Sequence, residues 1–307
     1  MTEYIEIIGE DYVHSSNSLL HFMTSPKYLT DALKRKALCP RYCNEDIEYL
    51  SIVRDGAAFN EVSVLQKCFC DIPLGNIIKR FPVKLTDNNS LSDEEMRCIP
   101  HEFSHPDFYG KYALAFSKKW GEINKLQPIH YLSNDADVVK QFSKMMCNVL
   151  QEENLPDSVS DALLNWMCYF KPLRGTMKRR EEIDSKGKIE IEVYKNFHDE
   201  HEWRYVPYGV EVNGHPLDCL IANGAVQSGL LKAISDSFEE EEYRPIWLPF
   251  QYDEIKYIIV PNNAGRLEII KTIHDLPEDK FEVGDIGLQK SILISKILML
   301  DDVKKDF

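Results

Sequence analysis

Two carboxylates stand two residues apart in the stretch 197–207, where Glu200 and Glu202 are followed by the cation of Arg204. The alternating run 189–194 comes before this stretch and predicts that it lies in or beside a strand. On a strand, residues two apart share one face, so the two carboxylates would repel each other. Such a pair is tolerated if water solvates it, if Arg204 neutralises it, or if catalysis needs a carboxylate of shifted pKa. A solvated face of an edge strand is the alternative without chemistry.

A histidine ends the first predicted strand of the chain. His21 lies in the apolar run 18–23, and Ser25 and Pro26 follow as an N-cap and a first-turn proline for a helix over 27–37. A lone histidine beside a buried strand is more often structural than functional. The position of His21 at a strand end nevertheless makes it a candidate site residue.

Further elements must position these residues. Strands are predicted over 62–69, 109–116 and 128–132, and two core-packing helices are predicted inside 134–170. A basic, glycine-containing linker, 171–188, leads back to the two glutamates. The remaining predicted elements are a helix over 225–238, a strand over 255–260, a helix over 266–274 and an apolar element over 292–300.

The composition is typical of a folded globular protein, since 44% of the 307 residues are hydrophobic and only 14 are glycine. The formal net charge of −14 argues against a diffuse grip on nucleic acid, which depends on neutralising phosphates. The segment 171–180 is the best local basic patch. No run of about 18 apolar residues exists, and the acidic start of the chain does not resemble a signal peptide. We therefore expect a cytoplasmic protein with no membrane partner.

The cysteines do not indicate a metal site. Eight are scattered along the chain, most of them within apolar runs, so packed thiols are expected in a reducing compartment. The pairs Cys39/Cys43 and Cys68/Cys70 do not have a standard zinc spacing. No metal is predicted.

Four blocks of sequence occur in an order that resembles the abortive-infection AbiGi family. They are His21-Phe22 before a helix, 68–73, 109–116 and 199–207. The resemblance extends from about residue 20 to residue 260 and is densest at these blocks. The family looks like a branch of a wider set of bacterial proteins, and that set resembles ADP-ribosyltransferases of the His-Tyr-Glu type.

The second resemblance implies a binding site for NAD. In such enzymes an early histidine contacts the adenosine ribose and a middle tyrosine stacks on nicotinamide. The implied ribose contact falls to His21, with Phe22 beside it. The nicotinamide contact falls to Tyr109 or Tyr112, between which the sequence does not choose. An aromatic face attracts the positively charged pyridinium ring in a desolvated pocket.

The same resemblance implies a catalytic role for Glu202. Cleavage of the bond between nicotinamide and ribose has an oxocarbenium-like transition state, which a carboxylate bonded to a ribose hydroxyl stabilises. Glu200 or Asp199 would orient or deprotonate the acceptor. Arg41 or Arg54 would meet the pyrophosphate.

We predict an α+β fold with an ADP-ribosyltransferase-like split, mostly antiparallel sheet over 1–260, a helical insertion over 134–170, and a C-terminal α/β extension over 261–307 packed on the same domain. The predicted function is an NAD-dependent ADP-ribosyltransferase toxin of an anti-phage system, acting on RNA, DNA or protein. One alternative is a non-enzymatic antitoxin or binding partner of a cognate toxin, since an acidic surface suits a basic partner. Another is an NAD glycohydrolase, which uses water as acceptor.

Overall fold

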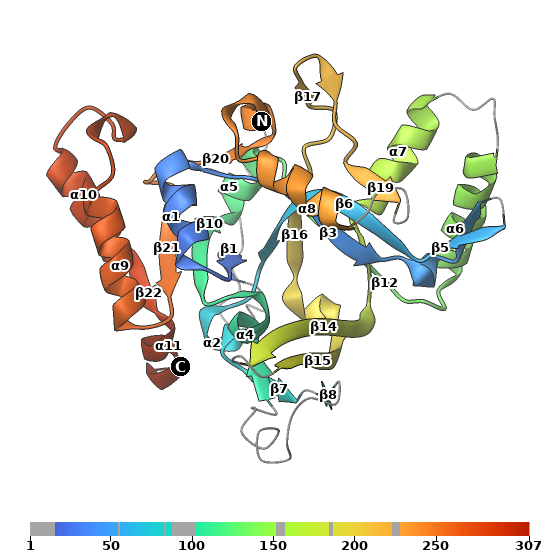
Figure 1. Cartoon of the computed structure of the whole chain (residues 1–307), viewed down its shortest axis with the longest axis horizontal. Coiled ribbons are helices and arrows are strands. Elements are labelled where there is room, and N and C mark those ends of the chain that lie inside the picture. The colour runs from blue at the N-terminus through green and yellow to red at the C-terminus, as the bar shows by residue number, and fades with distance from the viewer. Residues whose placement is uncertain are drawn as a thin grey trace, which may run out of the picture.

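The computed structural model describes residues 16–54, 56–82, 84–87, 102–151, 157–183, 187–222 and 228–306. A nine-stranded sheet forms its centre, and seven strands follow the order β11-β16-β6-β1-β10-β21-β22 (Figure 1). The seven are β11 (Gln127–Pro128), β16 (Glu202–Tyr205), β6 (Glu61–Cys70), β1 (Ser18–Met23), β10 (Tyr112–Ser117), β21 (Ile255–Val260) and β22 (Ile297–Met299). Strands β3 (Arg41–Asp46) and β19 (Leu220–Ala222) also pair with β6. Within this sheet only the pairing of β21 with β22 is parallel among the described residues, so the prediction of an α+β fold with a mostly antiparallel sheet is confirmed.

The first strand and helix form as the sequence predicts. Helix α1 (Pro26–Arg35) follows β1 directly, and the hydroxyl oxygen of Ser25 accepts a hydrogen bond from the backbone N–H of Lys27. Pro26 begins the helix at no cost, because the first N–H of a helix has no partner within it. The turn returns α1 across the sheet, so that it covers the strand that carries His21.

Alternating side chains bury both faces of the main sheet. Leu19 and Phe116 face a core that includes Leu29 of α1 and residues of α9 (Asn263–His274) and α10 (Ile286–Ser295). Leu20 and Ala115 face the opposite core, which is closed by α2 (Leu74–Ile77) and α11 (Leu300–Asp306). This alternation is the period of two that a strand imposes, and it fixes which side of the sheet each polar residue occupies.

A second large core lies at the other end of β6. Helices α6 (Asp137–Gln151) and α7 (Asp157–Met167) bury Phe142, Met146 and Met167 with Val64 of β6. Helix α8 (Ser228–Ser237) lies against β3, where Ser235 accepts a hydrogen bond from the backbone N–H of Tyr42. The long strand β6 therefore contributes to both cores and runs from the middle of the molecule towards α6 (Figure 1).

A separate three-stranded sheet forms one side of the site. It has the order β14-β15-β8, with β14 (Arg174–Ile183), β15 (Gly187–Asn196) and β8 (Lys84–Asp87). Two-stranded pairings complete the described structure. They are β2 (Ala37–Leu38) with β20 (Leu248–Pro249), β4 (Ile52–Arg54) with β5 (Ala57–Phe59), β7 (Arg80–Pro82) with β9 (Glu102–Ser104), β12 (His130–Leu132) with β13 (Phe170–Pro172), and β17 (Glu211–Val212) with β18 (His215–Pro216).

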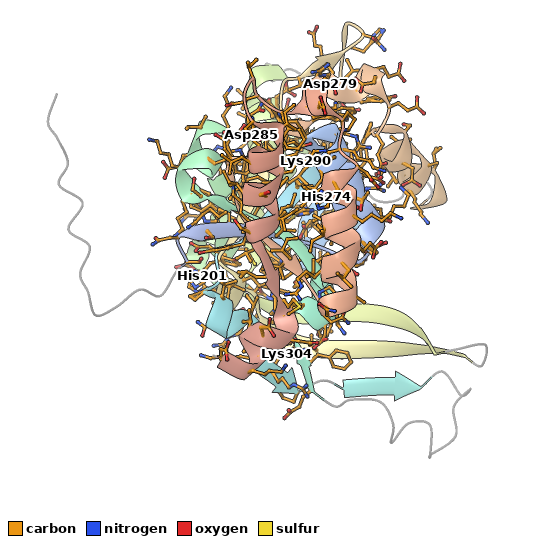
Figure 2. All side chains as sticks on the ribbon, turned by 90° about the vertical axis from the view of Figure 1, so that its left-hand side faces the viewer. His201, His274, Asp279, Asp285, Lys290 and Lys304 are labelled. Carbon is orange, nitrogen blue, oxygen red and sulfur yellow. The ribbon has the colours of Figure 1, made fainter. Side chains whose placement is uncertain are left out.

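The last elements of the chain extend the main sheet. Strand β22 adds to β21, and α9 and α10 lie side by side (Figure 2). The ammonium of Lys290 on α10 donates hydrogen bonds to the carbonyl oxygens of His274 and Leu276 at the end of α9. The division into residues 1–260 and an extension over 261–307 stays a prediction, although these contacts join the extension to the sheet. No helix in the described ranges is long and apolar enough to cross a membrane.

The predicted strand over 109–116 is wrong in its first residues. Helix α4 (His105–Tyr109) occupies that position, and β10 begins only at Tyr112. The carboxylate of Asp107 accepts hydrogen bonds from the backbone N–H and the hydroxyl of Ser104, which fixes the first turn of α4. Gly110 ends the helix with φ of 114°, where a Cβ atom would lie 2.1 Å from the backbone oxygen of Met23. Tyr109 is thus presented from a helix end and not from a strand.

Candidate functional site

A cavity opens where two neighbouring strands of the main sheet diverge. Strands β1 and β6 share one residue pair in the described structure, Leu20 with Cys70. Next to this pair, Nδ1 of His21 lies 2.8 Å from the carbonyl oxygen of Cys68, so the imidazole bridges the diverging strands. The adjoining cavity has a volume of about 770 Å³. Its walls come from β1, β3, β6, β16, α4 and the segment around Lys171.

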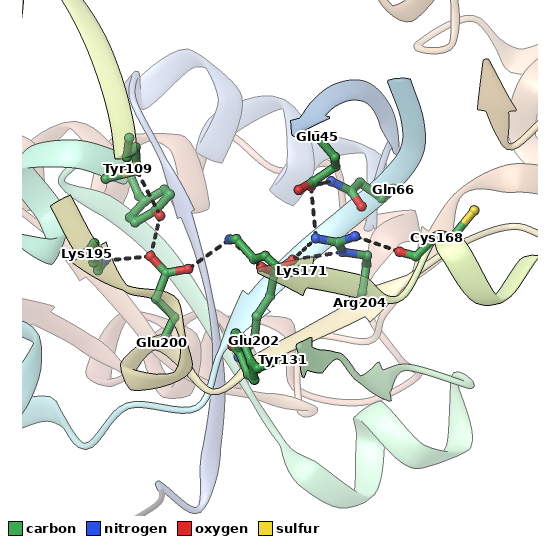
Figure 3. Close-up of polar contacts among 11 residues, drawn as sticks. Glu45, Gln66, Tyr109, Tyr131, Cys168, Lys171, Lys195, Glu200, Glu202 and Arg204 are labelled. Carbon is green, nitrogen blue, oxygen red and sulfur yellow. Dashed lines mark hydrogen bonds and ion pairs between the residues drawn. The ribbon is translucent and has the colours of Figure 1, made fainter. Parts of the chain in front are cut away.

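Two lysines and a tyrosine hold Glu200 at one end of this cavity (Figure 3). The ammonium of Lys171 lies 3.1 Å from Oε2 of Glu200, and the ammonium of Lys195 pairs with Oε1. The hydroxyl of Tyr109 donates a hydrogen bond to the same Oε1. Glu200 itself is buried. Three separate elements, α4, β13 and β15, therefore converge on one carboxylate.

Glu202 is also held by two cations, and it shares one of them, Lys171, with Glu200. The ammonium of Lys171 lies 2.9 Å from Oε2 of Glu202, and the guanidinium of Arg204 lies 2.9 Å from Oε1. Arg204 is completely buried, donates to the carbonyl oxygen of Cys168 at 2.6 Å, and pairs with Glu45 of β3 at 2.9 Å. Lys171 links the two glutamates, so all of these groups form one buried ion-pair network.

The two glutamates do not share one face of a single strand, and that expectation is wrong. Glu200 ends the 3₁₀ turn Phe197–Glu200, and β16 begins at Glu202. His201 lies between them with φ of 43° and redirects the chain. Both carboxylates can therefore approach Lys171 without the geometry of a regular strand. The alternative of a solvated outer face also fails, since both side chains are buried.

The network keeps both carboxylates ionised. Burial alone would raise the pKa of Glu202, but the charges of Arg204 and Lys171 outweigh it and lower the pKa to about 2. Burial likewise opposes ionisation of Glu200, and Lys171 and Lys195 nevertheless hold its pKa well below the usual range. A general base works best with a pKa near the working pH. Neither carboxylate has that property.

Two histidines of the cavity are uncharged. Burial and the nearby charge of Lys67 lower the pKa of His21 well below its usual value. Burial lowers the pKa of His105 to about 3. Because Nδ1 of a neutral His21 donates to the carbonyl oxygen of Cys68, its Nε2 is left as an acceptor. His21 can therefore receive a hydrogen bond from a hydroxyl or an amide.

The opposite end of the cavity is basic. Lys67 of β6 and Arg41 of β3 line it, and an adjoining hollow of about 240 Å³ is lined by Arg35 as well. Both arginines pair with Glu239, and Arg41 also pairs with Asp236. Lys67 has no ion pair or hydrogen bond to its side chain in the part of the chain that the structure describes. The cavity thus has one end with balanced charges and one end with a surplus cation.

Most of the predicted site residues come together. His21, Phe22, Tyr109, Arg41, Glu200 and Glu202 all line the cavity. Tyr112 does not, because it packs in the core near Gly265 of α9, so the choice between the two tyrosines falls on Tyr109. Asp199 lies on the far side of the turn and bonds the side-chain amide of Asn196. The side chain of Arg54 lies outside those the structure describes.

Sequence reasoning missed several residues of the site. Lys171 appeared only as part of a basic linker and a basic patch, and Lys195, Glu45 and Lys67 were not considered. Lys171 and Glu45 contact partners that lie far away in the chain, so no local spacing connects them, whereas Lys195 lies five residues from Glu200. A usable signal was the pair of nearby glutamates itself, because buried carboxylates require cations, and both Lys195 and Arg204 stand close to them in the sequence. The functional roles predicted for the lining residues stay predictions.

Comparison with known proteins gives the chain a family. Residues 90–261, more than half of the chain, match the family model described as "Putative abortive phage resistance protein AbiGi, antitoxin". This chain belongs to the AbiGi family. Abortive phage resistance protein AbiGi of Lactococcus lactis subsp. cremoris is 30% identical to it over 280 residues, which make up 88% of this chain and 100% of that protein. No solved structure matches.

The predicted toxin function is wrong. The AbiGi family model is described as an antitoxin, which contradicts an ADP-ribosyltransferase toxin and agrees better with the alternative of a binding partner. The comparisons give no support for enzymatic activity, whether transferase or NAD glycohydrolase. NAD as a ligand stays a prediction, and so does a cytoplasmic location.

The described cysteines form no metal site. No three or more histidine, cysteine or acidic side chains gather in a way that could hold an ion within the described ranges. The described cysteines are free thiols, and Cys98 lies outside the described residues. The Cys68 thiol lines the cavity, and burial raises its pKa well above the usual value. It is therefore not activated as a nucleophile.

Proposed function

We propose that this protein is the antitoxin of an abortive-infection pair and that it acts by binding a cognate toxin. The observation that carries the proposal is the match of residues 90–261 to a family described as an antitoxin. These residues include Glu200, Glu202 and all the cations that pair with them, so the match covers the buried network except for Glu45. The proposal assigns no reaction to the chain.

The geometry of the buried network supports a role without catalysis. Glu200 and Glu202 are each bound by two cations, and the low pKa of Glu202 makes it a poor proton acceptor near neutral pH. A buried, fully paired network of this kind stabilises one arrangement of the elements that it connects. Here it joins α4, β3, β15 and β16.

Surface charge indicates the chemistry of the partner. The chain has 50 acidic and 36 basic residues, and the exposed side chains of Glu240, Glu241 and Glu242 follow α8. An acidic surface attracts a basic partner over long range and raises the rate of association. We propose a toxin with a basic surface as the partner.

The split sheet of an ADP-ribosyltransferase-like fold is retained here as a proposal about architecture only. Its support is the divergence of β1 and β6 after one residue pair. A shared fold carries no activity by itself, because function depends on the site and not on the scaffold. An experimental structure compared with that fold class would test the proposal independently of the antitoxin function.

Expression in bacteria tests the proposed function. The chain alone should leave growth unchanged, whereas a toxic cognate partner should stop growth until this chain is expressed with it. The purified pair should run as one complex in size-exclusion chromatography at low salt, and its association rate should fall as salt rises.

Two results would contradict the proposal. One is growth arrest by this chain alone that disappears in the Glu202→Gln variant, since an antitoxin has no such activity. The other is rescue of growth without any complex between the purified proteins. The variant Glu122→Gln, at an exposed position of α5 (Lys118–Ile123), is the matched control.

A further inference from the structure

Helix α7 presents an apolar stripe to solvent. Its four members are spaced at i, i+3, i+4 and i+7 and so lie along one side of the helix: Val159, Ala162, Leu163 and Trp166. Trp166 is 62% exposed, Val159 is 39% exposed, and Ala162 is exposed as well. Scattered apolar residues are normal on a protein surface, but a continuous row of them marks a site of interaction. We call these four residues the α7 stripe.

The other side of α7 is fixed to the protein. Met167 is buried, and Leu164 packs against the core that α7 shares with α6 and β6. Directly after the helix, the guanidinium of Arg204 donates a hydrogen bond to the carbonyl oxygen of Cys168. The stripe is therefore held in place before any partner arrives, and binding to it costs less conformational entropy than binding to a loop that must first be ordered.

The part of the chain that contains the stripe is acidic. Residues 145–170 include no lysine, arginine or histidine, but they include four carboxylates, those of Glu152, Glu153, Asp157 and Asp161. Asp161 is exposed on α7. Burial and the nearby charge of Asp161 raise the pKa of Tyr208, whose side chain is itself 48% exposed. Apolar and aromatic side chains beside carboxylates fit a partner that carries apolar side chains among lysines or arginines.

A second set of exposed apolar side chains lies at the other end of the molecule. Leu267 of α9 and Leu288 and Ile292 of α10 are exposed, and Figure 1 shows these helices opposite α6 and α7. Helices α9 and α10 lie outside residues 90–261, which match the family described as an antitoxin, whereas α7 lies inside them. For a function that belongs to the family, the α7 stripe is therefore the better candidate.

We propose that the α7 stripe is the surface on which this chain binds its cognate toxin, and that the toxin meets it with apolar side chains flanked by lysine or arginine. Trp166 is the main anchor, and Asp161 attracts the cations of the toxin. The inference rests on the proposed antitoxin function and names the surface that performs it. The cavity beside Glu200 and Glu202 is not part of this surface, since no residue of α7 lines it.

Isothermal titration calorimetry with variants of the full chain tests the proposal. The probe is the product of a gene next to that of this chain, chosen because it stops growth alone and this chain restores growth. Trp166→Asp should weaken the complex about tenfold or more, because a large aromatic anchor accounts for much of the affinity of an interface. The carboxylate that this change adds would attract a basic partner, so charge alone predicts the opposite result.

Two controls separate the stripe from the rest of the surface. Leu267→Asp places the same new charge at an exposed apolar position of α9 and should bind the toxin as the unchanged protein does. Asp161→Asn should slow association about twofold at low salt, whereas Glu122→Gln on α5 should leave the rate unchanged. Circular dichroism establishes that each variant is folded.

Amide hydrogen exchange of the complex gives a second readout that needs no variant. Slower exchange over residues 157–168 in the presence of the toxin supports the proposal. Protection confined to other segments overturns it, and so does full affinity and full rescue of growth by the folded Trp166→Asp variant. A free chain that is a dimer, and that becomes a monomer in Trp166→Asp, also overturns it, since a second copy would then cover the stripe.

These results distinguish the surface from the function. If the unchanged chain binds the toxin but Trp166→Asp binds it equally well, the antitoxin function stands and the α7 stripe is the wrong surface. If the unchanged chain forms no complex with the toxin that it neutralises, the proposed function fails and this inference fails with it.

Discussion

The two ends of the cavity differ in how their charges are satisfied. At the carboxylate end, Lys171, Lys195 and Arg204 balance three acidic side chains, those of Glu45, Glu200 and Glu202. At the basic end, Lys67 makes no ion pair or side-chain hydrogen bond with the part of the chain that the structure describes. The charges at the first end are balanced, and the second end has a cation with no described partner.

This difference indicates which charged residues of the cavity stabilise the fold and which lower its stability. A buried ion pair contributes little net stability compared with apolar packing, but removal of one partner leaves an uncompensated charge and is strongly destabilising. A buried charge without a partner already lowers the stability of the unchanged protein, because it has lost its hydration and gained no ion pair. Residues that reduce stability are often those a protein keeps for function. By this criterion the paired glutamates stabilise the fold, and Lys67 is kept at a cost to stability. The catalytic roles predicted for Glu200 and Glu202 stay predictions.

The largest effect is expected at the carboxylate end. Lys171→Met removes the cation shared by Glu200 and Glu202, whose side chains stay buried. We expect the free energy of unfolding to fall by ~3 kcal/mol, the lower part of the range for a broken buried pair. Urea denaturation followed by tryptophan fluorescence measures it.

The matched control for this change is Lys232→Met, which removes an exposed lysine from α8. It should alter the free energy of unfolding by less than ~0.5 kcal/mol. If Lys171→Met is equally mild, the network is not what holds this end together, and the comparison between the two ends fails.

A change in pH is expected to have an effect of similar size at most. The pKa of Glu202 is lowered from its usual 4.5 to about 2 in the folded protein. Its ionised form therefore stabilises the fold above the unfolded pKa, and this contribution is lost as pH falls from about 4.5 towards 2, amounting to ~3 kcal/mol at most. The gap in unfolding free energy between the unchanged protein and Glu202→Gln should be constant above about pH 5.5 and narrow below pH 4.5.

Glu122→Gln removes an exposed carboxylate and serves as the control for the pH series. The difference in unfolding free energy between this variant and the unchanged protein should stay near zero over the whole pH series. If the difference in unfolding free energy between the unchanged protein and Glu202→Gln does not change with pH, the neighbouring cations do not lower the pKa of Glu202.

The sequence predicted well those helices and strands that depend only on residues close together in the chain. The Ser25 cap, the proline after it and the apolar residues of β1 and β21 required only neighbours in the chain. The prediction over 109–116 failed because the Ser104 and Asp107 contact created a helix that an alternating pattern concealed. Where a strand pattern and a helix cap compete, hydrogen bonds decide between them, and the apolar pattern alone does not show which one forms.

The site was predicted in part. Glu202 and His21 were both found from the sequence, and both line the cavity. Glu202 begins β16, but His21 lies inside β1 and not at its end as predicted. Lys171 and Lys195 were not, since their contacts with Glu200 depend on how β15 and the segment after α7 pack in three dimensions. Lys67 had no signal at all, because the divergence of two strands is what exposes it to the cavity.

The smallest expected change in the free energy of unfolding is an increase, caused by substitution of Lys67. Burial lowers the pKa of Lys67, so its charge is disfavoured in the folded state. Lys67→Met keeps an apolar side chain of similar length and should raise the free energy of unfolding by ~1 kcal/mol at neutral pH. The unfolded chain binds more protons than the folded protein between the lowered and the usual pKa, so the advantage should shrink as pH rises towards 10.5. Thermal unfolding without ligand measures both. A loss of stability as large as that of Lys171→Met would mean that Lys67 is a structural cation, and the two ends of the cavity would then be alike.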